Sequence, residues 1–367
     1  MLNRKSVPIM ELLENIGWTN VGVIALCGIF LIFLLPRVFH RKTSLEDPAN
    51  PNLSVAEYNR RGNEMYQQHL YKRAAGEYGH MIEKAPDAVD GYLLRAMAES
   101  EGGDYKGAVR DNTEALKHAR LAEVRDPLYF NRGLAYRNMG DYTDAVPDFT
   151  QALALNPKNW NAYEVRAFCY TELLDYDRAI ADYTVAIGHD AHPGTVFERG
   201  QAYLKKKEYP KALADLNRSL SVRPNFAPGY RLRAETYVGM KEFDQAAKDE
   251  EAALRLDNSA AGRGGLGWYQ YLAGKLPEAI QNSQMAVKMD PNLTFARFNL
   301  ALFSAVQGNA EAAKTAYQDT LLHAKSADIQ GALQDVKDAL KKQPNSPALK
   351  QAQTLLQDAL LHASTTP

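Results

Sequence analysis

The six residues from Gly262 to Gly267 read GRGGLG and fit the GxGxxG pattern of a dinucleotide-binding loop. In such a loop the glycines follow a strand and open a helix, so that backbone N–H groups can bind a pyrophosphate. No strand pattern precedes these glycines, and they fall inside a segment with helical periodicity. We therefore interpret them as part of a helix and expect no nucleotide cofactor.

The histidines and cysteines are too sparse to form a catalytic or metal centre. His189 and His192 lie in a predicted turn with no third histidine or cysteine beside them. Cys27 lies in an apolar run and Cys169 in a predicted helix, so neither a disulfide framework nor a CxxC metal site is expected. Walker, GxSxG and HExxH motifs are absent from the sequence. We predict that the protein is not an enzyme and has no catalytic, metal-binding or cofactor-binding residues.

The elements that would position any site are set by an alanine that returns eight times. The steps between successive alanines are 34, 37, 34, 33, 34, 33 and 34 residues, and a tyrosine or phenylalanine precedes six of them by three residues. A period in this range without strand-like alternation is typical of a helical solenoid. The repeating alanines are Ala74, Ala108, Ala145, Ala179, Ala212, Ala246, Ala279 and Ala313.

The third unit shows the full pattern of one repeat. Small residues stand where two helices must approach, aromatic residues fill the space around that contact, and a proline ends the second helix. This pattern resembles the tetratricopeptide repeat (TPR) family over roughly residues 55 to 325. The resemblance implies an all-α, right-handed superhelical solenoid of about eight helix pairs. The residues that carry it in this unit are Tyr129, Gly133, Tyr136, Ala145, Phe149, Ala152 and Pro157.

The repeat divides the chain into eight units, followed by two further predicted helices. The C-terminal region, 326–367, reads as helices that cap the last open face of the solenoid. Within it, residues 346–363 have a broad apolar stripe, so self-association is the alternative interpretation. The units are 55–88, 89–125, 126–159, 160–192, 193–226, 227–259, 260–293 and 294–325.

The N-terminal region has a second strong feature, an uninterrupted apolar or glycine run from Val21 to Leu35. Taken as residues 18–36, it approaches the roughly 20 residues that a membrane-spanning helix needs. The residues after the run lack the small-x-small pattern of a cleaved signal peptide, which favours an uncleaved anchor. An amphipathic segment, 1–17, precedes it, and a polar tether, 37–54, follows it. Arg37, Arg41 and Lys42 flank the run closely, so the positive-inside rule favours a single-pass membrane protein with a cytosolic solenoid.

The net charge of −1 over 367 residues gives no sign of a phosphate-binding surface, and we expect no nucleic-acid partner. The partners implied by the resemblance are proteins or peptide segments. The chain therefore reads as a membrane-anchored scaffold or adaptor that holds partner segments in a concave groove. The alternative is a structural subunit of a stable membrane complex, assembled through the C-terminal helices or the convex face.

In TPR proteins the first helix of each pair lines the concave surface, and the resemblance assigns inward positions on those helices. Aromatic and aliphatic residues at these positions would supply apolar anchor pockets. Some of them would instead pack between repeats if the register differs by one residue. Polar inward candidates are Asn59, Asn63, Glu164, Glu172, Lys205 and Arg231. The predicted groove residues are Phe130, Leu134, Arg137, Phe168, Phe197, Leu204, Trp268, Tyr271, Phe295, Phe298 and Leu302.

Some co-chaperone TPR domains bind chaperone C-termini through a clamp of lysine and asparagine residues. Asn63 matches the first asparagine of that clamp, but Asn59 stands where its lysine belongs. Leu94, Pro127 and Asn131 occupy its remaining positions. The first three units therefore do not support a chaperone clamp.

Overall fold

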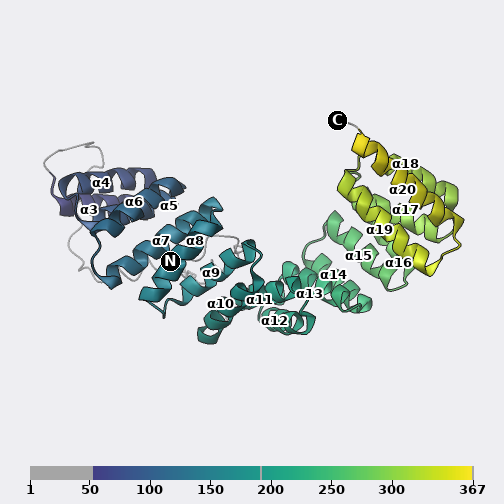
Figure 1. The fold of residues 1–367 in the computed structure, drawn as a ribbon, viewed down its shortest axis with the longest axis horizontal. Coiled ribbons are helices and arrows are strands. Elements are labelled where there is room, and N and C mark those ends of the chain that lie inside the picture. Colours follow the sequence, from purple (N-terminus) through teal and green to yellow (C-terminus); the bar gives the residue numbers. More distant parts are fainter. Residues whose placement is uncertain (1–52, 191, 366–367) are drawn as a thin grey trace, which may run out of the picture. The chain divides into compact units, whose positions relative to one another are not determined.

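The computed structural model describes residues 53–190 and 192–365, which form 18 helices, α3 to α20, and no strand (Figure 1). The first sixteen helices follow one another as eight helix–turn–helix pairs. The pairs are α3 (Val55–Gln67) with α4 (Tyr71–Lys84), α5 (Val89–Glu101) with α6 (Tyr105–His118), α7 (Ala122–Met139) with α8 (Tyr142–Leu155), α9 (Trp160–Glu172) with α10 (Tyr176–His189), α11 (Pro193–Lys205) with α12 (Tyr209–Val222), α13 (Ala227–Gly239) with α14 (Phe243–Leu256), α15 (Ala260–Leu272) with α16 (Leu276–Met289), and α17 (Thr294–Val306) with α18 (Ala310–Leu321). The last two helices are α19 (Ser326–Lys342) and α20 (Pro347–Thr365).

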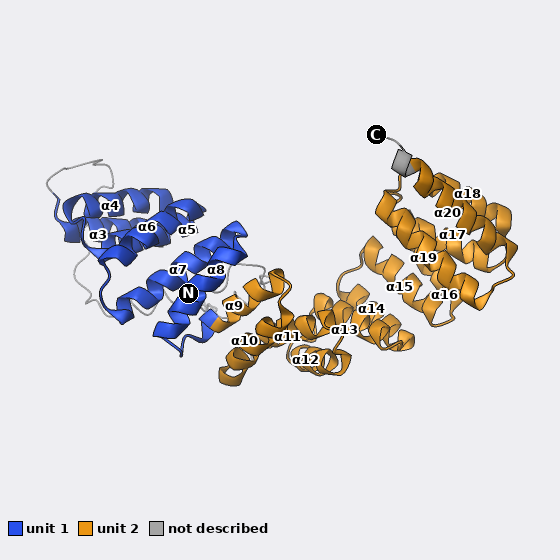
Figure 2. Cartoon of the chain, viewed as in Figure 1, with its two compact units in different colours: residues 1–162 blue, residues 163–367 orange. Residues whose placement is uncertain are grey.

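The chain divides into two compact units, residues 1–162 and 163–367 (Figure 2). Within each unit a helix packs mainly on its own partner and on the helices next to it in the chain. Such a neighbour-on-neighbour stack is the arrangement that a helical repeat predicts, because each pair can bury its apolar face only against the next pair.

Small residues sit where the two helices of a pair touch. The eight repeating alanines are all buried. Gly62 and Gly133 are required for a related reason. A Cβ on Gly62 would lie 2.5 Å from Cε1 of Tyr78, and one on Gly133 would lie 2.9 Å from Cε1 of Phe149. Each aromatic ring thus occupies the space that a side chain on the facing helix would need.

The three-residue insertion that separates Ala108 from Ala145 lengthens the first helix of the third pair. The helix α6 ends at His118 and α7 already begins at Ala122, so α7 has 18 residues where the other first helices have 13. Pro127 lies inside α7. Most of the extra length extends α7 at its N-terminus, and one residue extends its end, so that only Gly140 and Asp141 separate α7 from α8.

An arginine–aspartate ion pair recurs in five successive helix pairs and joins the two helices of each. The repeat pattern did not predict it. In each pair an arginine of the first helix donates two hydrogen bonds, 2.5 to 2.9 Å long, to an aspartate 16 residues later. A further bond from Arg199 reaches Thr184 of the preceding pair, and Arg233 reaches Asn217 in the same way. We call these pairs the arginine ladder: Arg95–Asp111, Arg132–Asp148, Arg166–Asp182, Arg199–Asp215 and Arg233–Asp249.

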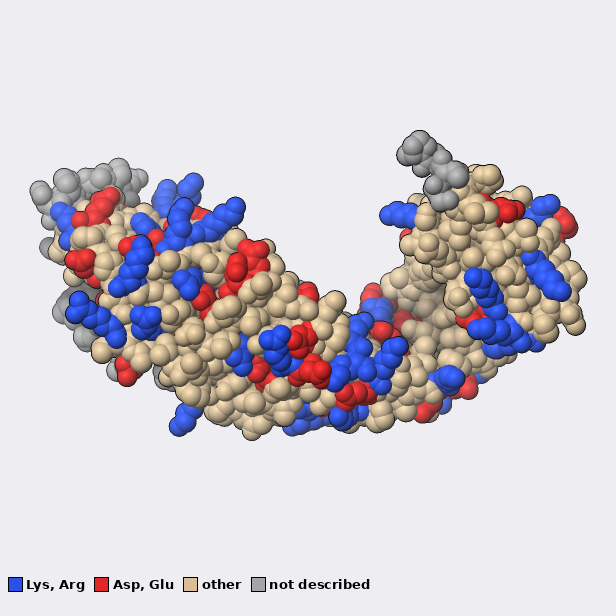
Figure 3. All heavy atoms as spheres, viewed as in Figure 1, with Lys and Arg blue, Asp and Glu red and all other residues tan. Residues whose placement is uncertain are grey.

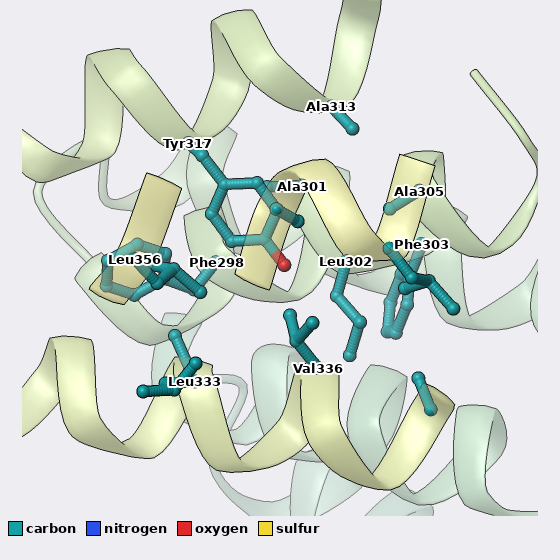
Figure 4. Packing of buried hydrophobic residues seen from close by; sticks show 14 of the residues in the cluster. Phe298, Ala301, Leu302, Phe303, Ala305, Ala313, Tyr317, Leu333, Val336 and Leu356 are labelled. Carbon is teal, nitrogen blue, oxygen red and sulfur yellow. The ribbon is translucent and has the colours of Figure 1, made fainter. Parts of the chain in front are cut away.

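The C-terminal helices cover the last repeat. Leu333 and Val336 of α19 and Leu356 of α20 pack with Phe298 and Tyr317 in one buried cluster (Figure 4). The apolar stripe predicted in residues 346–363 belongs to this cluster and is covered by the chain itself. It therefore acts as a cap on the last repeat. Its fully buried members are Ala348, Leu349, Ala352 and Leu356.

The predicted anchor at 18–36 and the N-terminal segment 1–17 lie outside the described residues, as does nearly all of the tether. Within residues 53–190 and 192–365, no helix is long and apolar enough to span a membrane.

Candidate protein-binding groove

One open groove of about 570 Å³ lies in the unit formed by residues 163–367. Its walls come from the first helices of three successive pairs, α11, α13 and α15, with one residue from α14. The helical repeat places the equivalent faces of these helices side by side, so the groove runs across consecutive repeats. The lining residues are Phe197, Gln201, Pro228, Arg231, Leu232, Glu235, Glu250, Ser259, Ala261, Gly262, Gly265 and Tyr269.

Two aromatic side chains, Phe197 and Tyr269, line the groove together with the apolar Pro228, Leu232 and Ala261. The ring of Phe197 meets that of Phe226 edge to face, with centroids 5.0 Å apart, and Arg223 stacks on Phe226 at 3.9 Å. Tyr269 packs against the cluster of Ala247, Leu254 and Leu266, and burial raises its pKa to about 12. Both anchors are therefore held in place by their surroundings before any partner arrives, which lowers the entropy cost of binding.

The glycines of the GxGxxG match lie inside α15, as the sequence analysis expected. Gly262 and Gly265 form part of the groove lining. A Cβ on Gly262 would come within 2.9 Å of Glu250 Oε1, whereas a Cβ on Gly265 would meet nothing within 4 Å. Gly267, by contrast, packs against α16. Gly262 and Gly267 thus allow close packing, and Gly265 leaves the groove surface open.

The polar side chains of the groove are largely paired with one another. Arg231 lies 3.5 Å from Glu250 Oε1 and donates to Asp257 Oδ2 at 2.9 Å. Burial raises the pKa of Glu250 despite the nearby arginine. On the face seen in Figure 3, acidic and basic side chains are interspersed. The groove thus combines aromatic anchors with a few fixed charges, a composition suited to holding a peptide.

Only Phe197 of the eleven predicted groove residues lines this groove. Trp268 and Tyr271 pack beside the C-terminal cluster, and Phe295 is exposed but lies against Gly264. Arg137 and Phe168 are half-buried. The remaining five are buried and contribute to the core: Phe130, Leu134, Leu204, Phe298 and Leu302.

Several groove-lining residues were not predicted, because each of them follows an assigned inward position by one residue in the sequence. Tyr269 follows Trp268 directly, and one residue turns a side chain by about 100° around the axis. Glu250 lies on α14, the second helix of its pair, whereas the assigned inward positions are all on first helices. Arg231, one of the polar candidates, lines this groove.

Of the two histidines discussed in the sequence analysis, His192 has a local structural role. The Nδ1 atom of His192 accepts a hydrogen bond of 3.2 Å from the backbone N–H of Gly194 and so caps the start of α11. This bond satisfies one of the free N–H groups at the helix start.

A second, smaller cavity of about 230 Å³ lies where α15, α17 and the capping helix α19 meet. Tyr271, Val306 and Lys342 line it, and the Lys342 ammonium stands 5.9 Å from the centre of the Tyr271 ring.

Two stretches of the chain, residues 127–159 and 231–294, match family models of the tetratricopeptide repeat. Solved structures with the same fold include the C-terminal part of a TPR repeat-containing protein from Cytophaga hutchinsonii, with a TM-score of 0.57 at 18% identity over 66% of this chain and 98% of that one. A tetratricopeptide repeat protein from Parabacteroides merdae aligns with a TM-score of 0.52 at 18% identity over 73% of this chain and 98% of that one. The described part of the chain is thus an all-α, TPR-like helical solenoid.

Among curated proteins, the small glutamine-rich tetratricopeptide repeat-containing protein 2 of Saccharomyces cerevisiae is 34% identical over 84 residues, which cover 23% of this chain and 24% of the relative. Hsp70-Hsp90 organizing protein 3 of Arabidopsis thaliana is 27% identical over 95 residues, 26% of this chain and 17% of the relative. The matched segments therefore span a quarter or less of these relatives. They support the presence of tetratricopeptide repeats in this chain.

Proposed function

We propose that this protein is an interaction scaffold that holds an extended segment of a partner protein in the groove between α11 and α15. The groove itself supports the proposal most directly: two fixed aromatic anchors, Phe197 and Tyr269, flank an open surface that runs across three successive repeats. Apolar anchors set among a few polar groups are the usual composition of a peptide-binding site.

Filling the groove with a side chain tests the proposal. In Gly265→Leu the new side chain enters open space at the groove surface, and it replaces glycine with a better helix former. The helix should therefore keep its fold while the groove loses accessible volume. We expect partners that co-purify with the full-length chain to be depleted at least tenfold with this variant, measured by quantitative mass spectrometry.

Gly331→Leu is the matched control. Gly331 also lies within a helix, α19, and a Cβ there also meets nothing within 4 Å, but the residue does not line the groove. An equal loss of partners in both variants would point to a general effect of the substitution. Unchanged partners in Gly265→Leu would refute the groove as the binding site.

The name of one relative, Hsp70-Hsp90 organizing protein 3, raises the question of chaperone partners. In this chain the side chain of Asn63 is engaged internally, because it accepts a hydrogen bond of 2.8 Å from Tyr78 and donates one of 3.0 Å to Asn59. The same position would have to bind a chaperone C-terminus in a carboxylate clamp. We therefore do not assign chaperone binding to the first unit.

We also propose that residues 18–36 anchor the scaffold to a membrane and so raise its local concentration there. Only the apolar run in the sequence supports this step. Deletion of residues 1–36 should move the protein from an alkali-washed membrane pellet into the supernatant. A full-length chain that is itself released by the alkaline wash would contradict the anchor.

A further inference from the structure

The groove lies where the arginine ladder ends. Its first two helices, α11 and α13, each carry a ladder arginine, Arg199 and Arg233. In the next helix pair, Leu266 and Asn282 stand at the equivalent positions, each 33 residues after its counterpart in the preceding pair. Leucine has no hydrogen-bond donor in its side chain. The third helix of the groove, α15, therefore lies beyond the ladder.

The ladder also joins neighbouring helix pairs, because its arginines reach back to the second helix of the preceding pair. Arg199 Nη1 donates a hydrogen bond of 3.1 Å to the Thr184 hydroxyl, and Arg233 Nη1 donates one of 2.7 Å to Oδ1 of Asn217. Hydrogen bonds from a guanidinium group are charge-assisted and directional, so each one fixes the position of a pair against its neighbour. From α10 to α14, these bonds tie each helix to the next.

The contact between α14 and α15 is of a different kind. Ala247 and Leu254 of α14 pack with Leu266 of α15 in a small buried cluster, and the partly buried Tyr269 packs against it. The two helices come close at Gly262, where a Cβ would lie 2.9 Å from Leu254 Cδ2. Apolar contacts have no preferred direction, and helices packed in this way can slide past each other.

The polar contacts across this junction are weak. Arg231 Nη2 lies 3.4 Å from Ser259 Oγ at the start of α15, which is a long hydrogen bond. Lys275, just after α15, donates to Asp244 of α14 at 2.5 Å, but both side chains are exposed. Exposed ion pairs contribute little to stability and are screened by salt. Neither contact holds α15 against α14 as the ladder holds α13 against α12.

The helices beyond the junction form one body. A single buried cluster contains residues from α16 to α20, and Trp268 and Tyr271 of α15 pack against it. A Cβ on Gly264 would lie 2.6 Å from Cε2 of Phe295, so α15 also lies close to α17. Gly267 allows the same close approach to α16. Helix α15 is thus fixed to the helices that follow it.

We propose that the groove has a fixed wall and a movable wall. Helices α11 and α13 form the fixed wall, and α15 slides against α14 together with α16–α20 as one body. This motion changes the distance between Phe197 on α11 and Tyr269 on α15, so that the groove accommodates partner side chains of different sizes. The motion is a property of the fold, and its use in binding rests on the groove being the binding site, as proposed above.

Distance distributions between nitroxide labels, measured by double electron–electron resonance on the full-length chain, test the proposal. Labels attached through a genetically encoded amino acid leave both native cysteines unmodified. One pair of labels, at Ala214 and Gln281, spans the α14–α15 junction, and the matched control pair, at Ala181 and Lys248, lies within the ladder. All four residues are exposed and stand two positions after a repeating alanine, and both pairs of labels are 67 residues apart.

We expect the distribution across the junction to be about twice as broad as the control distribution, because only the control pair is tied by ladder bonds throughout. The double variant Leu266→Arg with Asn282→Asp supplies the missing ion pair, and Glu251 of α14, the counterpart of Asn217, then supplies an acceptor across the junction. This variant should narrow the distribution across the junction to the width of the control. Circular dichroism checks that it folds, and the comparison of the two label pairs in the unmodified chain does not depend on it.

Equal widths for the two label pairs would overturn the movable wall and leave the proposed function standing, since Gly265→Leu tests that function separately. A folded double variant that keeps the broad distribution would overturn the missing ion pair as the cause of the motion. A broad distribution across the junction, together with unchanged partners in Gly265→Leu, would refute the groove as the binding site and, with it, the use of the motion in binding.

Discussion

Leu174 has a backbone conformation that suits glycine better than leucine. It is the middle residue of the turn between α9 and α10, with φ 61° in the left-handed region, and its side chain is 71% exposed. Four equivalent turns have glycine here: Gly103, Gly140, Gly274 and Gly308. For a residue with a Cβ this conformation costs about 1–2 kcal/mol of stability. The exposed side chain offsets little of that cost, because it makes few packing contacts.

Leu174→Gly should therefore stabilise the protein, by roughly 0.5–1 kcal/mol after the added flexibility of the unfolded chain is subtracted. The measurement is the urea midpoint followed by circular dichroism. Leu173→Gly is the control, since Leu173 is also exposed but its φ is not positive. That variant should lower the midpoint. A lower midpoint for both variants would show that the Leu174 side chain makes a stabilising contact.

Glu198 should make the stability depend on pH in an unusual direction. Its pKa is raised to about 7 in the folded protein, so the folded state holds a proton that the unfolded state has lost above about pH 4.5. The contribution of Glu198 is therefore fully present at low pH and is lost as the pH rises toward 7, after which it stays constant.

Replacing the carboxyl group with an amide removes that dependence. Relative to the unmodified chain, Glu198→Gln should gain about 1–2 kcal/mol more at pH 8 than at pH 5. Urea unfolding of both proteins at pH 5, 6, 7 and 8 measures the difference. A constant difference across this range would mean that Glu198 titrates normally.

At the scale of the element, α15 contains two glycines with opposite requirements. A Cβ on Gly267 would lie 2.5 Å from Ser283 Oγ and 2.9 Å from the carbonyl oxygen of Ala279, both on α16. A Cβ on Gly265 would meet nothing within 4 Å. Glycine-to-alanine substitution at these two positions therefore tests helix propensity and close packing independently.

Gly267→Ala should destabilise the protein by about 1–3 kcal/mol, because backbone and side chain of α16 must move apart. Gly265→Ala should stabilise it by roughly 0.5–1 kcal/mol, since alanine favours the helix. Thermal unfolding monitored at 222 nm would show opposite shifts. Shifts of the same sign would contradict the close approach of α15 and α16.

The arginine ladder links successive helices through buried charges. Asp215 is 6% exposed, so Arg199→Met would leave its carboxylate without a partner in a mostly buried position, at a cost of about 3–5 kcal/mol. The double variant Arg199→Met with Asp215→Leu should recover at least half of that loss, because an apolar pair of similar size has no charge to desolvate. Additive losses in urea unfolding would show that the pair matters through its shape alone.

The repeat period predicted the helix pairs because the alanine, glycine and aromatic positions follow directly from helices that must touch. The arginine ladder was missed because Arg199 and Asp215, taken singly, look like residues of a solvated helix face. The groove was predicted less well. A side chain at an inward position of a first helix can either line the groove or pack against the next helix. The sizes of the neighbouring side chains determine which of the two it does. Gly264, for example, leaves room for Phe295 to lie against α15.

At the scale of the whole molecule, the last repeat of the unit formed by residues 163–367 depends on having its end face covered. Within residues 163–367, α19 and α20 bury Phe298, Leu302 and Tyr317 of the last repeat. A solenoid that ends on an uncovered apolar face is poorly soluble. The capping helices are therefore part of the fold rather than an appendage.

Removal of residues 326–367 should expose that cluster and make the truncated protein aggregate. Light scattering during heating should show an onset at least 5 °C lower than that of the full-length chain, in line with a loss of several kcal/mol. Removing only residues 363–367 is the control and should leave the onset unchanged. A fully soluble truncation with an unchanged onset would mean that the last repeat is stable without its cap.

The central claim is that partners bind in the groove between α11 and α15. The most direct measurement places a photo-crosslinking amino acid at Gln201, which lines the groove, or at Gln281, which is exposed on α16, in the full-length chain in cells. The account predicts discrete partner crosslinks from position 201 that disappear when Gly265→Leu is added. Crosslinks from position 281 alone, or crosslinks from position 201 that persist with Gly265→Leu, would contradict it.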